Sequence, residues 1–274
     1  MMIQDIDFGR LYKEHMIAAG GMKRPPEEWD DRAKDLNRFV VESNSYVSDF
    51  TALMQFDDCS TLLDVGCGPG TIGLFLAPRL EKVYGLDYSQ GMLANLQANA
   101  AAMGAQNVVP IQRAWEDDWS DVPECDLVVA SRSTGVMDIA DALVKLDAKS
   151  RRRVYLTSPV GGRFVPAEIY DVVGRPRPQQ RPTQPDYIYI PNLLYQMGRR
   201  PKIDYIANDN HLIDPGDFDS FARSVSFSLR GLRKEERDRL ADWYAVTPDC
   251  NQRIRGGPTH WAFIYWDTEA ARCI

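Results

Sequence analysis

A regular alternation of strand and helix patterns constrains the fold of this chain more than any other feature of its sequence. The strand candidates are short and nearly continuously apolar, as expected of a parallel sheet that is covered on both faces. Helical segments stand between them, where parallel strands require crossover connections. We therefore predict a doubly wound α/β sheet. The predicted strands are 61–65, 82–87, 107–112, 125–131 and 152–158, and the helices between them are 71–80, 90–103 and 137–149.

The segments on either side of this alternation follow other patterns. Residues 5–19 and 27–54 have helical patterns, and the second is either one long helix or two short ones. Nine of the 17 prolines lie between residues 159 and 215, and proline removes ladder donors and fixes φ. The sequence therefore predicts an insertion or lid over 159–200 that is neither central strand nor helix interior.

Two further strands, at 201–207 and 260–267, complete the predicted sheet, and a charged helix covers 233–245 between them. Its charges are typical of a solvated face with i,i+4 pairs. These patterns divide the chain into four parts. The parts are an N-terminal helical lid (1–56), an α/β core (57–158), a proline-rich insertion with the sixth strand (159–215) and a C-terminal part of the core with the final strand (216–274).

Composition narrows the classes of function. The 274 residues are 44% hydrophobic and 26% charged, which is ordinary for a soluble globular protein. A net charge of −7 argues against broad nucleic-acid binding, and no window approaches the apolar length of a membrane span. The five cysteines have no metal-ligand spacing and the three histidines are not paired, so no metal site is predicted. An odd cysteine count without a signal-peptide pattern favours reduced thiols and a cytoplasmic location.

The stretch LLDVGCGPG, residues 62–70, joins the first predicted strand to the first helix. Glycines let the backbone adopt positive φ and let a ligand approach it without a Cβ in the way. A dinucleotide fingerprint would need a third glycine at position 71, where Thr71 stands. Asp64 at the mouth of the turn suits a ligand end with a positive charge, directly or through the turn's own hydrogen bonds.

Asp87 ends the second predicted strand. An acid at this place accepts hydrogen bonds from both ribose hydroxyls in other doubly wound nucleoside binders. Ser89 follows as a predicted N-cap of the next helix, which Gly104 is expected to end. We therefore expect a nucleoside-like ligand with a cationic tail at the carboxyl ends of the strands.

With these residues the chain resembles the class I S-adenosylmethionine (SAM)-dependent methyltransferases of the type 11/12-like group, over about residues 30–158 and the last two strands. The resemblance implies a seven-stranded Rossmann-like sheet with a final antiparallel strand, SAM as cofactor and methyl transfer as activity. AWED (114–117) stands where the family places its adenine contacts, and ASRS (130–133) where its fourth motif faces cofactor and substrate. Many members have Asp near position 113 or 114 to bind the adenine amine, whereas this chain has Arg113 and Ala114. Glu116 or backbone groups would have to bind the amine instead.

The resemblance also implies the residues of the cofactor site. Trp115 is equally well explained as a packing aromatic, and Cys67 as a small residue that fits the turn. The implied cofactor-binding residues are Asp64, Gly66, Cys67, Gly68, Gly70, Asp87, Tyr88, Met92, Ala114, Trp115, Glu116 and Ser131.

The methyl acceptor is not determined by any motif. The [ND]PP[YF] pattern of amino-group methylation is absent after the fourth strand, where SRST stands, and so is a Pro-Cys pair for cytosine C5. We favour a small-molecule acceptor over RNA or protein, and a SAM-binding protein without catalysis remains a third hypothesis. We identify no catalytic residue. The candidates for lid and acceptor contacts are His15, Trp29, Arg32, Arg132, Tyr187 and Tyr195, with Arg175, Arg177 and Arg181 as further cations of the insertion.

Overall fold

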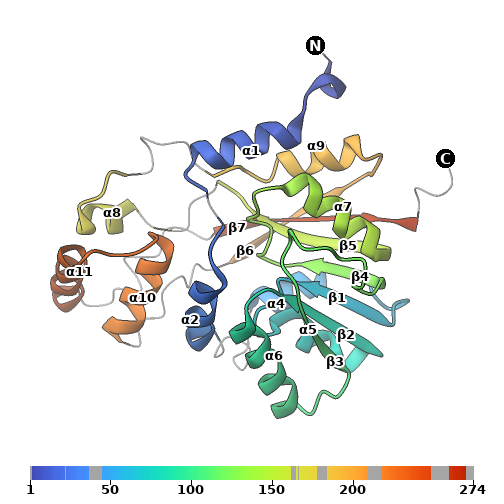
Figure 1. Ribbon diagram of the computed structural model, residues 1–274, viewed down its shortest axis with the longest axis horizontal. Coiled ribbons are helices and arrows are strands. Elements are labelled where there is room, and N and C mark those ends of the chain that lie inside the picture. Colours follow the sequence, from blue (N-terminus) through green and yellow to red (C-terminus); the bar gives the residue numbers. More distant parts are fainter. Residues whose placement is uncertain are drawn as a thin grey trace.

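One seven-stranded sheet forms the centre of the protein (Figure 1). The computed structural model describes residues 2–21, 23–36, 45–161, 165, 167–177, 184–208, 217–247 and 259–269. The strand order is β3-β2-β1-β4-β5-β7-β6, in which β1 to β5 are parallel and β7 pairs antiparallel with both β5 and β6. The predicted doubly wound sheet with an antiparallel final strand is confirmed. The strands are β1 (Thr61–Val65), β2 (Lys82–Asp87), β3 (Val108–Gln112), β4 (Cys125–Ala130), β5 (Ser150–Pro159), β6 (Lys202–Asn208) and β7 (Thr259–Asp267).

Helices cover both faces of the sheet. Leu63 and Val65 of β1 belong to a core shared with α1 (Phe8–Ala18), α7 (Ile139–Lys149) and α9 (Tyr189–Gln196). Leu62, on the opposite face of the same strand, packs with α4 (Ser45–Ala52) and α5 (Thr71–Leu76), beside which α6 (Gln90–Ala102) lies. Both faces of β1 are buried, which explains why its sequence is continuously apolar rather than alternating.

Three further helices form a separate group beyond the carboxyl edge of the sheet, at the left of Figure 1. They are α8 (Ala167–Val173), α10 (Phe218–Ser228) and α11 (Lys234–Val246), and they pack around their own core. The buried Glu236 of α11 accepts two hydrogen bonds from Arg175, of 2.9 and 2.7 Å, which joins α11 to the segment after α8.

The prediction that 159–200 contains no helix interior is wrong, since α8 and α9 both lie in it. Pro191 is the third residue of α9, within the first turn, where a helix has no intrahelical partner for the backbone N–H. The two helices also have different partners. Whereas α8 contacts α11, α9 contacts α1 and α7 on the sheet.

The helix α1 is shorter than the pattern over residues 5–19 from which it was predicted. Within 27–54 the structure contains α2 (Pro26–Leu36) and α4, and residues 37–44 lie outside the described part of the chain. A short 3₁₀ turn (Ile3–Asp5) precedes α1, and a turn at Gly20, with φ of +71°, ends it. In the described ranges no helix is both long and apolar enough to cross a membrane.

Candidate functional site

The turn between β1 and α5 is held tightly against its neighbours. Gly66 and Cys67 donate backbone hydrogen bonds of 2.7 and 3.1 Å to the carbonyl of Leu86. Gly66 has φ of +65°, and a Cβ added there would lie 2.4 Å from Cβ of Ser133, in the loop after β4. Gly68 also has positive φ, of +54°, but its added Cβ would meet only the sulfur of Met92 at 3.9 Å. The turn therefore has one packed side and one side with room for a ligand.

Asp64 supports this turn from inside the protein. Its carboxylate is 2% exposed and accepts a hydrogen bond of 3.0 Å from the backbone N–H of Gly73, in the first turn of α5. Burial raises the pKa of Asp64 to about 7. Of the two roles considered for Asp64, this geometry favours action through the hydrogen bonds of the turn.

Asp87 connects the end of β2 to the same turn. Its two carboxylate oxygens accept hydrogen bonds of 2.9 Å from the backbone N–H groups of Gly68 and Ser89. Burial raises the pKa of Asp87, and the backbone hydrogen bonds oppose that shift. Each oxygen of a carboxylate has a second lone pair, so Asp87 keeps acceptor capacity for a ligand hydroxyl.

A cavity of about 360 Å³ lies past the ends of β2 and β3. Backbone and side chains of three regions meet there: the segment before α2, the end of β2 and the loop after β3. Asp117 accepts a hydrogen bond of 2.7 Å from the backbone N–H of Ala114 at this cavity. The lining residues are Lys23, Pro26, Tyr88, Gln112, Arg113, Ala114 and Asp117.

Two residues predicted to contact the adenine, Glu116 and Trp115, make contacts with other side chains in the structure. Glu116 forms an ion pair of 2.7 Å with Lys23 and is not among the lining residues of the cavity, whereas its neighbour Asp117 is. The ring of Trp115 lies 5.4 Å from that of Trp119 and packs against the core, and its carbonyl accepts a hydrogen bond of 2.5 Å from Lys145. The alternative interpretation of Trp115 as a packing aromatic thus agrees with the structure.

The loop after β4 completes the site on its other side. Ser133 donates a hydrogen bond of 2.7 Å to the carbonyl of Val65, directly before the glycine turn. The hydroxyl of Ser131 lies 2.8 Å from that of Tyr46, which is fully buried and is also 2.9 Å from the hydroxyl of Thr157. This network fixes Ser131, Arg132 and Ser133 beside the turn.

Trp29 and Arg32 of α2 face the separate helical group instead of the glycine turn. The ring of Trp29 packs edge-on against Phe227 of α10 at 4.9 Å, and Arg32 donates a hydrogen bond of 2.9 Å to Ser224. The guanidinium of Arg24 lies 4.0 Å from the centre of the Phe227 ring. These contacts correct the expectation that Trp29 and Arg32 themselves lie over the cofactor; they anchor α2.

His15 and Tyr187 lie near the carboxyl edge of the sheet. Nδ1 of His15 is 3.1 Å from the hydroxyl of Tyr189, at the start of α9. The hydroxyl of Tyr187 is 2.6 Å from that of Tyr205, which stands beside Ala262 and hence at the level of Ser158 near the end of β5.

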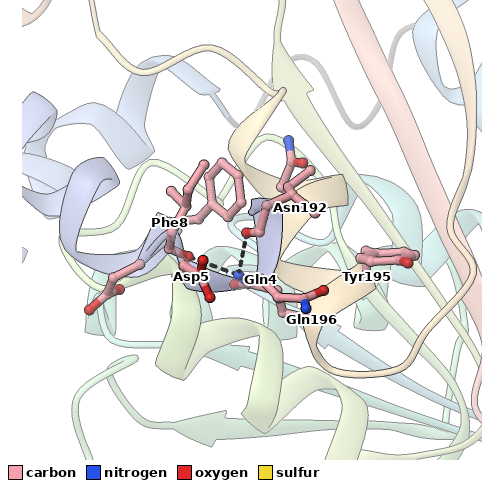
Figure 2. A pocket seen from close by; sticks show the side chains of 9 residues that line it. Gln4, Asp5, Phe8, Asn192, Tyr195 and Gln196 are labelled. Atoms are coloured by element: carbon pink, nitrogen blue, oxygen red, sulfur yellow. Dashed lines mark hydrogen bonds between the residues drawn. The ribbon is translucent and has the colours of Figure 1, made fainter. Parts of the chain in front are cut away.

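Tyr195 does not lie at this edge, and its role as an acceptor contact stays a prediction. It lines a cavity of about 550 Å³ between α9 and the start of the chain, where Gln196 donates a hydrogen bond of 2.8 Å to the carbonyl of Ile6 (Figure 2). Arg199, just beyond α9, donates to Asp147 at 2.5 Å near the end of α7, on the amino side of the sheet. Residues 189–196 form a helix, which separates Tyr195 from Tyr187. An extended segment would have placed the two side chains on the same face.

Two of the three arginines that were predicted as cations of the insertion form ion pairs with acidic side chains of nearby helices. Arg175 pairs with Glu236, Arg177 pairs with Asp171, and Arg181 lies outside the described residues. Among the residues that the structure describes, no group of three or more His, Cys, Asp or Glu is placed to hold a metal ion. Cys59, Cys67 and Cys125 are free buried thiols, and burial raises the pKa of Cys67.

Sequence reasoning missed four residues of the site. Asp30 of α2 binds the start of α6, Lys23 and Pro26 line the cavity, and Tyr46 supports the loop after β4. Tyr46 lies in the segment 27–54 that was predicted to be helical, and a helical pattern does not indicate a polar partner.

Comparisons with known proteins identify the class. A family model described as a methyltransferase domain matches residues 62–148. The fold resembles a SAM-dependent methyltransferase of Geobacter sulfurreducens solved with S-adenosyl-L-homocysteine, at TM-score 0.50 and 15% identity over 82% of this chain and 90% of that one. It also resembles a candidate methyltransferase of Bacillus halodurans, at TM-score 0.51 and 12% identity over 81% and 98% of the two chains. Residues 62–148 thus belong to a methyltransferase domain, and the fold around them is that of the class I SAM-dependent methyltransferases.

The chain also has a relative of nearly the same extent. An uncharacterized protein of Haemophilus influenzae is 35% identical over 270 residues, which cover 98% of this chain and 99% of the relative. A much shorter match, 44% identical over 54 residues, joins 20% of this chain to 9% of a mouse tRNA (uracil-5-)-methyltransferase homolog.

Proposed function

We propose that this methyltransferase transfers the methyl group of SAM to a small-molecule acceptor. The observation that carries the proposal is the cover over the carboxyl edge of the sheet. Asp30 of α2 accepts hydrogen bonds of 2.6 Å from the Ser89 hydroxyl and 2.8 Å from the backbone N–H of Gly91, at the start of α6. Lys23, just before α2, and Pro26, its first residue, line the cavity past β2 and β3. A covered edge suits a small acceptor better than a folded macromolecule.

The residues fit the cofactor on independent grounds. Gly66 and Gly68 have φ values of +65° and +54°, which glycine adopts without strain, and open space adjoins Gly68. We propose that Asp87 accepts the ribose hydroxyls, because it is a buried acid held by backbone donors with lone pairs to spare. Asp64 and Gly70 maintain the turn, and Ser131 faces the methionine part from the loop after β4.

The adenine ring is assigned to the cavity past β2 and β3. Tyr88 and Ala114 line it, and Met92 lies close by under Gly68. We assign the adenine amine to the carboxylate of Asp117, in place of Glu116, because Asp117 lines the cavity.

The sulfonium of bound SAM supplies an electrophilic methyl group, so the protein mainly has to position the acceptor in line and exclude water. We assign the cofactor to the core, and the surroundings of the acceptor to α1, α2 and the chain after β5. His15 of α1, Tyr189 at the start of α9 and Tyr187 just before α9 are polar side chains near this edge.

An RNA acceptor is the second candidate, because a short stretch is similar to the mouse tRNA methyltransferase homolog. The net charge of −7 weighs against it, since phosphate contacts rest on basic surfaces.

Calorimetric titration tests the cofactor part of the proposal. We expect SAM and S-adenosylhomocysteine to bind at micromolar levels and NAD to bind more weakly. Asp87→Ala should weaken S-adenosylhomocysteine binding by about 1–3 kcal/mol, because ribose hydroxyls lose a charged acceptor. Asp126→Asn is the matched control, since this aspartate also accepts backbone N–H groups, from Ser60 and Thr61, but at the amino edge of the sheet. Tighter binding of NAD, or equal effects of the two variants, would contradict the assignment.

Methyl transfer from tritiated SAM tests the acceptor. Fractions of a cell extract containing small molecules, RNA or protein are offered separately. Label in the small-molecule fraction is the expected result. Label in RNA or protein would establish the second candidate or its protein counterpart, and tight SAM binding with no label anywhere would favour a protein without catalysis.

A further inference from the structure

Arg132 has a left-handed backbone although it is not glycine. Its φ is +56°, and among the described non-glycine residues only Arg230 shares a positive value, +58°. Arg230 follows the C-cap of α10, where helices commonly end in this conformation. Arg132 instead follows a strand, β4, and a left-handed residue there costs about 1–2 kcal/mol. Such strain persists where neighbouring contacts enforce it, and it is concentrated at functional sites.

The contacts that enforce it come from both sides of Arg132. Its own backbone N–H donates a hydrogen bond of 2.9 Å to the hydroxyl of Thr157, on β5. Ser133 is tied to the carbonyl of Val65 at 2.7 Å, and Ser131 to the hydroxyl of Tyr46 at 2.8 Å. The backbone of Arg132 is therefore fixed between the glycine turn, β5 and α4.

The side chain is presented to solvent on a rigid support. Cζ of Arg132 lies 4.2 Å from the centre of the Tyr46 ring, and that tyrosine is fully buried with its hydroxyl held by Ser131 and Thr157. Arg132 itself is exposed, and in the described ranges its guanidinium makes no ion pair, unlike those of Arg175 and Arg199. A guanidinium that rests on a ring by its face leaves its N–H edge available for a carboxylate or phosphate.

We propose that Arg132 binds a carboxylate or phosphate group on the small-molecule methyl acceptor. The inference rests on the proposed function and adds the chemical class of the acceptor. Asp87, assigned to the ribose, stands at the end of β2, with β1 between it and β4. Arg132 is thus on the far side of the glycine turn from the ribose. In a chain of net charge −7 the overall field repels anions, so an anionic acceptor needs a local cation of this kind.

The first test separates Arg132 from the cofactor. S-adenosylhomocysteine is titrated into the wild-type protein, Arg132→Gln, Arg132→Lys and the control Arg237→Gln, which removes an exposed arginine of α11 that pairs with Asp219. We expect all four affinities to agree within about threefold. A loss of tenfold or more in Arg132→Gln alone would place Arg132 at the cofactor carboxylate and overturn the inference. Failure of the wild-type protein to bind would instead overturn the proposed function.

The second test follows methyl transfer from tritiated SAM to a ribonuclease-treated small-molecule extract that has been divided on an anion exchanger. We expect the acceptor in the retained, anionic fraction. Arg132→Gln should lower kcat/KM by at least about 30-fold, as loss of one partner of a charged pair does, with Arg132→Lys intermediate and Arg237→Gln unchanged. An acceptor in the unretained fraction, or wild-type turnover by Arg132→Gln, overturns the inference.

A third test needs no natural acceptor. Benzoate, phenyl phosphate and the neutral benzamide are each offered to the complex with S-adenosylhomocysteine, and binding is followed by ligand-observed NMR. We expect benzoate or phenyl phosphate to bind the wild-type protein and not Arg132→Gln, and benzamide to bind neither. The choice between the two anions distinguishes a carboxylate from a phosphate. Equal binding of benzamide, or no binding of either anion, counts against the inference.

Discussion

The carboxylate of Asp30 lies 2.6 Å from the hydroxyl of Ser89, the residue that caps α6 beside the ribose-site candidate Asp87. The same oxygen of Asp30 also accepts from the backbone N–H of Gly91 at 2.8 Å. An acid at this position satisfies a free donor of α6 and complements the positive end of the helix dipole. The N-terminal cover is thereby attached directly to the framework of the cofactor site.

Asp30→Ala should loosen this attachment. We expect faster cleavage by protease between α1 and α2 and several-fold weaker binding of S-adenosylhomocysteine, because charged hydrogen bonds contribute about 1.5–3 kcal/mol each. Glu27→Ala is the matched control, since Glu27 is an exposed acid in the first turn of the same helix. Both properties are measured by limited proteolysis and calorimetry. Equal behaviour of the two variants would show that α2 is held by its contacts with α10 alone.

Gly66→Ala and Gly104→Ala form a matched pair of substitutions at positive φ. The two φ values are +65° and +69°, but an added Cβ meets Ser133 at 2.4 Å in the first case and nothing within 4 Å in the second. Gly104→Ala should lower the free energy of unfolding by about 1 kcal/mol without changing cofactor affinity. Gly66→Ala should cost more and also weaken cofactor binding. Urea unfolding and calorimetry measure both effects, and equal losses in the two variants would refute a tight turn.

The raised pKa of Asp64, about 7, predicts a pH dependence of stability. Between the ordinary pKa and 7 the folded protein holds a proton that the unfolded chain releases, so wild-type stability declines with rising pH. Relative to Asp64→Asn, the decline should approach about 1.4 kcal/mol per pH unit and level off above pH 7. Urea unfolding of both proteins at several pH values measures it. Asp118 is exposed and its pKa is lowered, so the difference in stability between the wild-type protein and Asp118→Asn should not change with pH in this window. A slope in that difference, or no slope relative to Asp64→Asn, contradicts the prediction.

Glu236→Gln should destabilise the group formed by α8, α10 and α11. Glu236 is buried, and the guanidinium groups of Arg175 and Arg233 hold the pKa of its carboxyl well below the ordinary range. Removing its charge leaves Arg175 without a counter-charge, at a cost of about 3 kcal/mol. Hydrogen exchange should show the loss in these helices first, with cofactor affinity unchanged. The exposed Glu235→Gln serves as control, and protection that falls equally in the sheet would argue against a separate helical group.

The core of the fold could be predicted because each element has its own local signal. β1 and β2 have the bounds that the sequence predicts, and Ser89 caps α6 as predicted, accepting from the backbone N–H of Met92 at 3.1 Å. The helices after β5 gave weaker signals. Proline at 191 argues against a helix only if it lies beyond the first turn, and the sequence alone does not reveal where α9 begins.

How well the position of a predicted site residue follows from the sequence depends on the element that carries it. Asp64 and Asp87 are fixed by the strands that carry them, so their placement follows from the sheet. Trp29 and Tyr195 depend on which surface their helix meets, and those surfaces belong to distant parts of the chain. Trp29 meets Phe227, and Tyr195 lies beside the first residues of the chain. Neither contact has a local signature.

The position of β7 has a consequence for how the chain is made. It lies between β5 and β6, although it is synthesised after both, and β6 pairs with β7 alone. While the intervening residues emerge from the ribosome, β5 keeps an open edge and β6 has no strand beside it. Open edges invite pairing with other chains. The nascent protein therefore presents its most aggregation-prone surface until residues 259–267 arrive, and the edge of β5 is where we expect a chaperone to bind during translation.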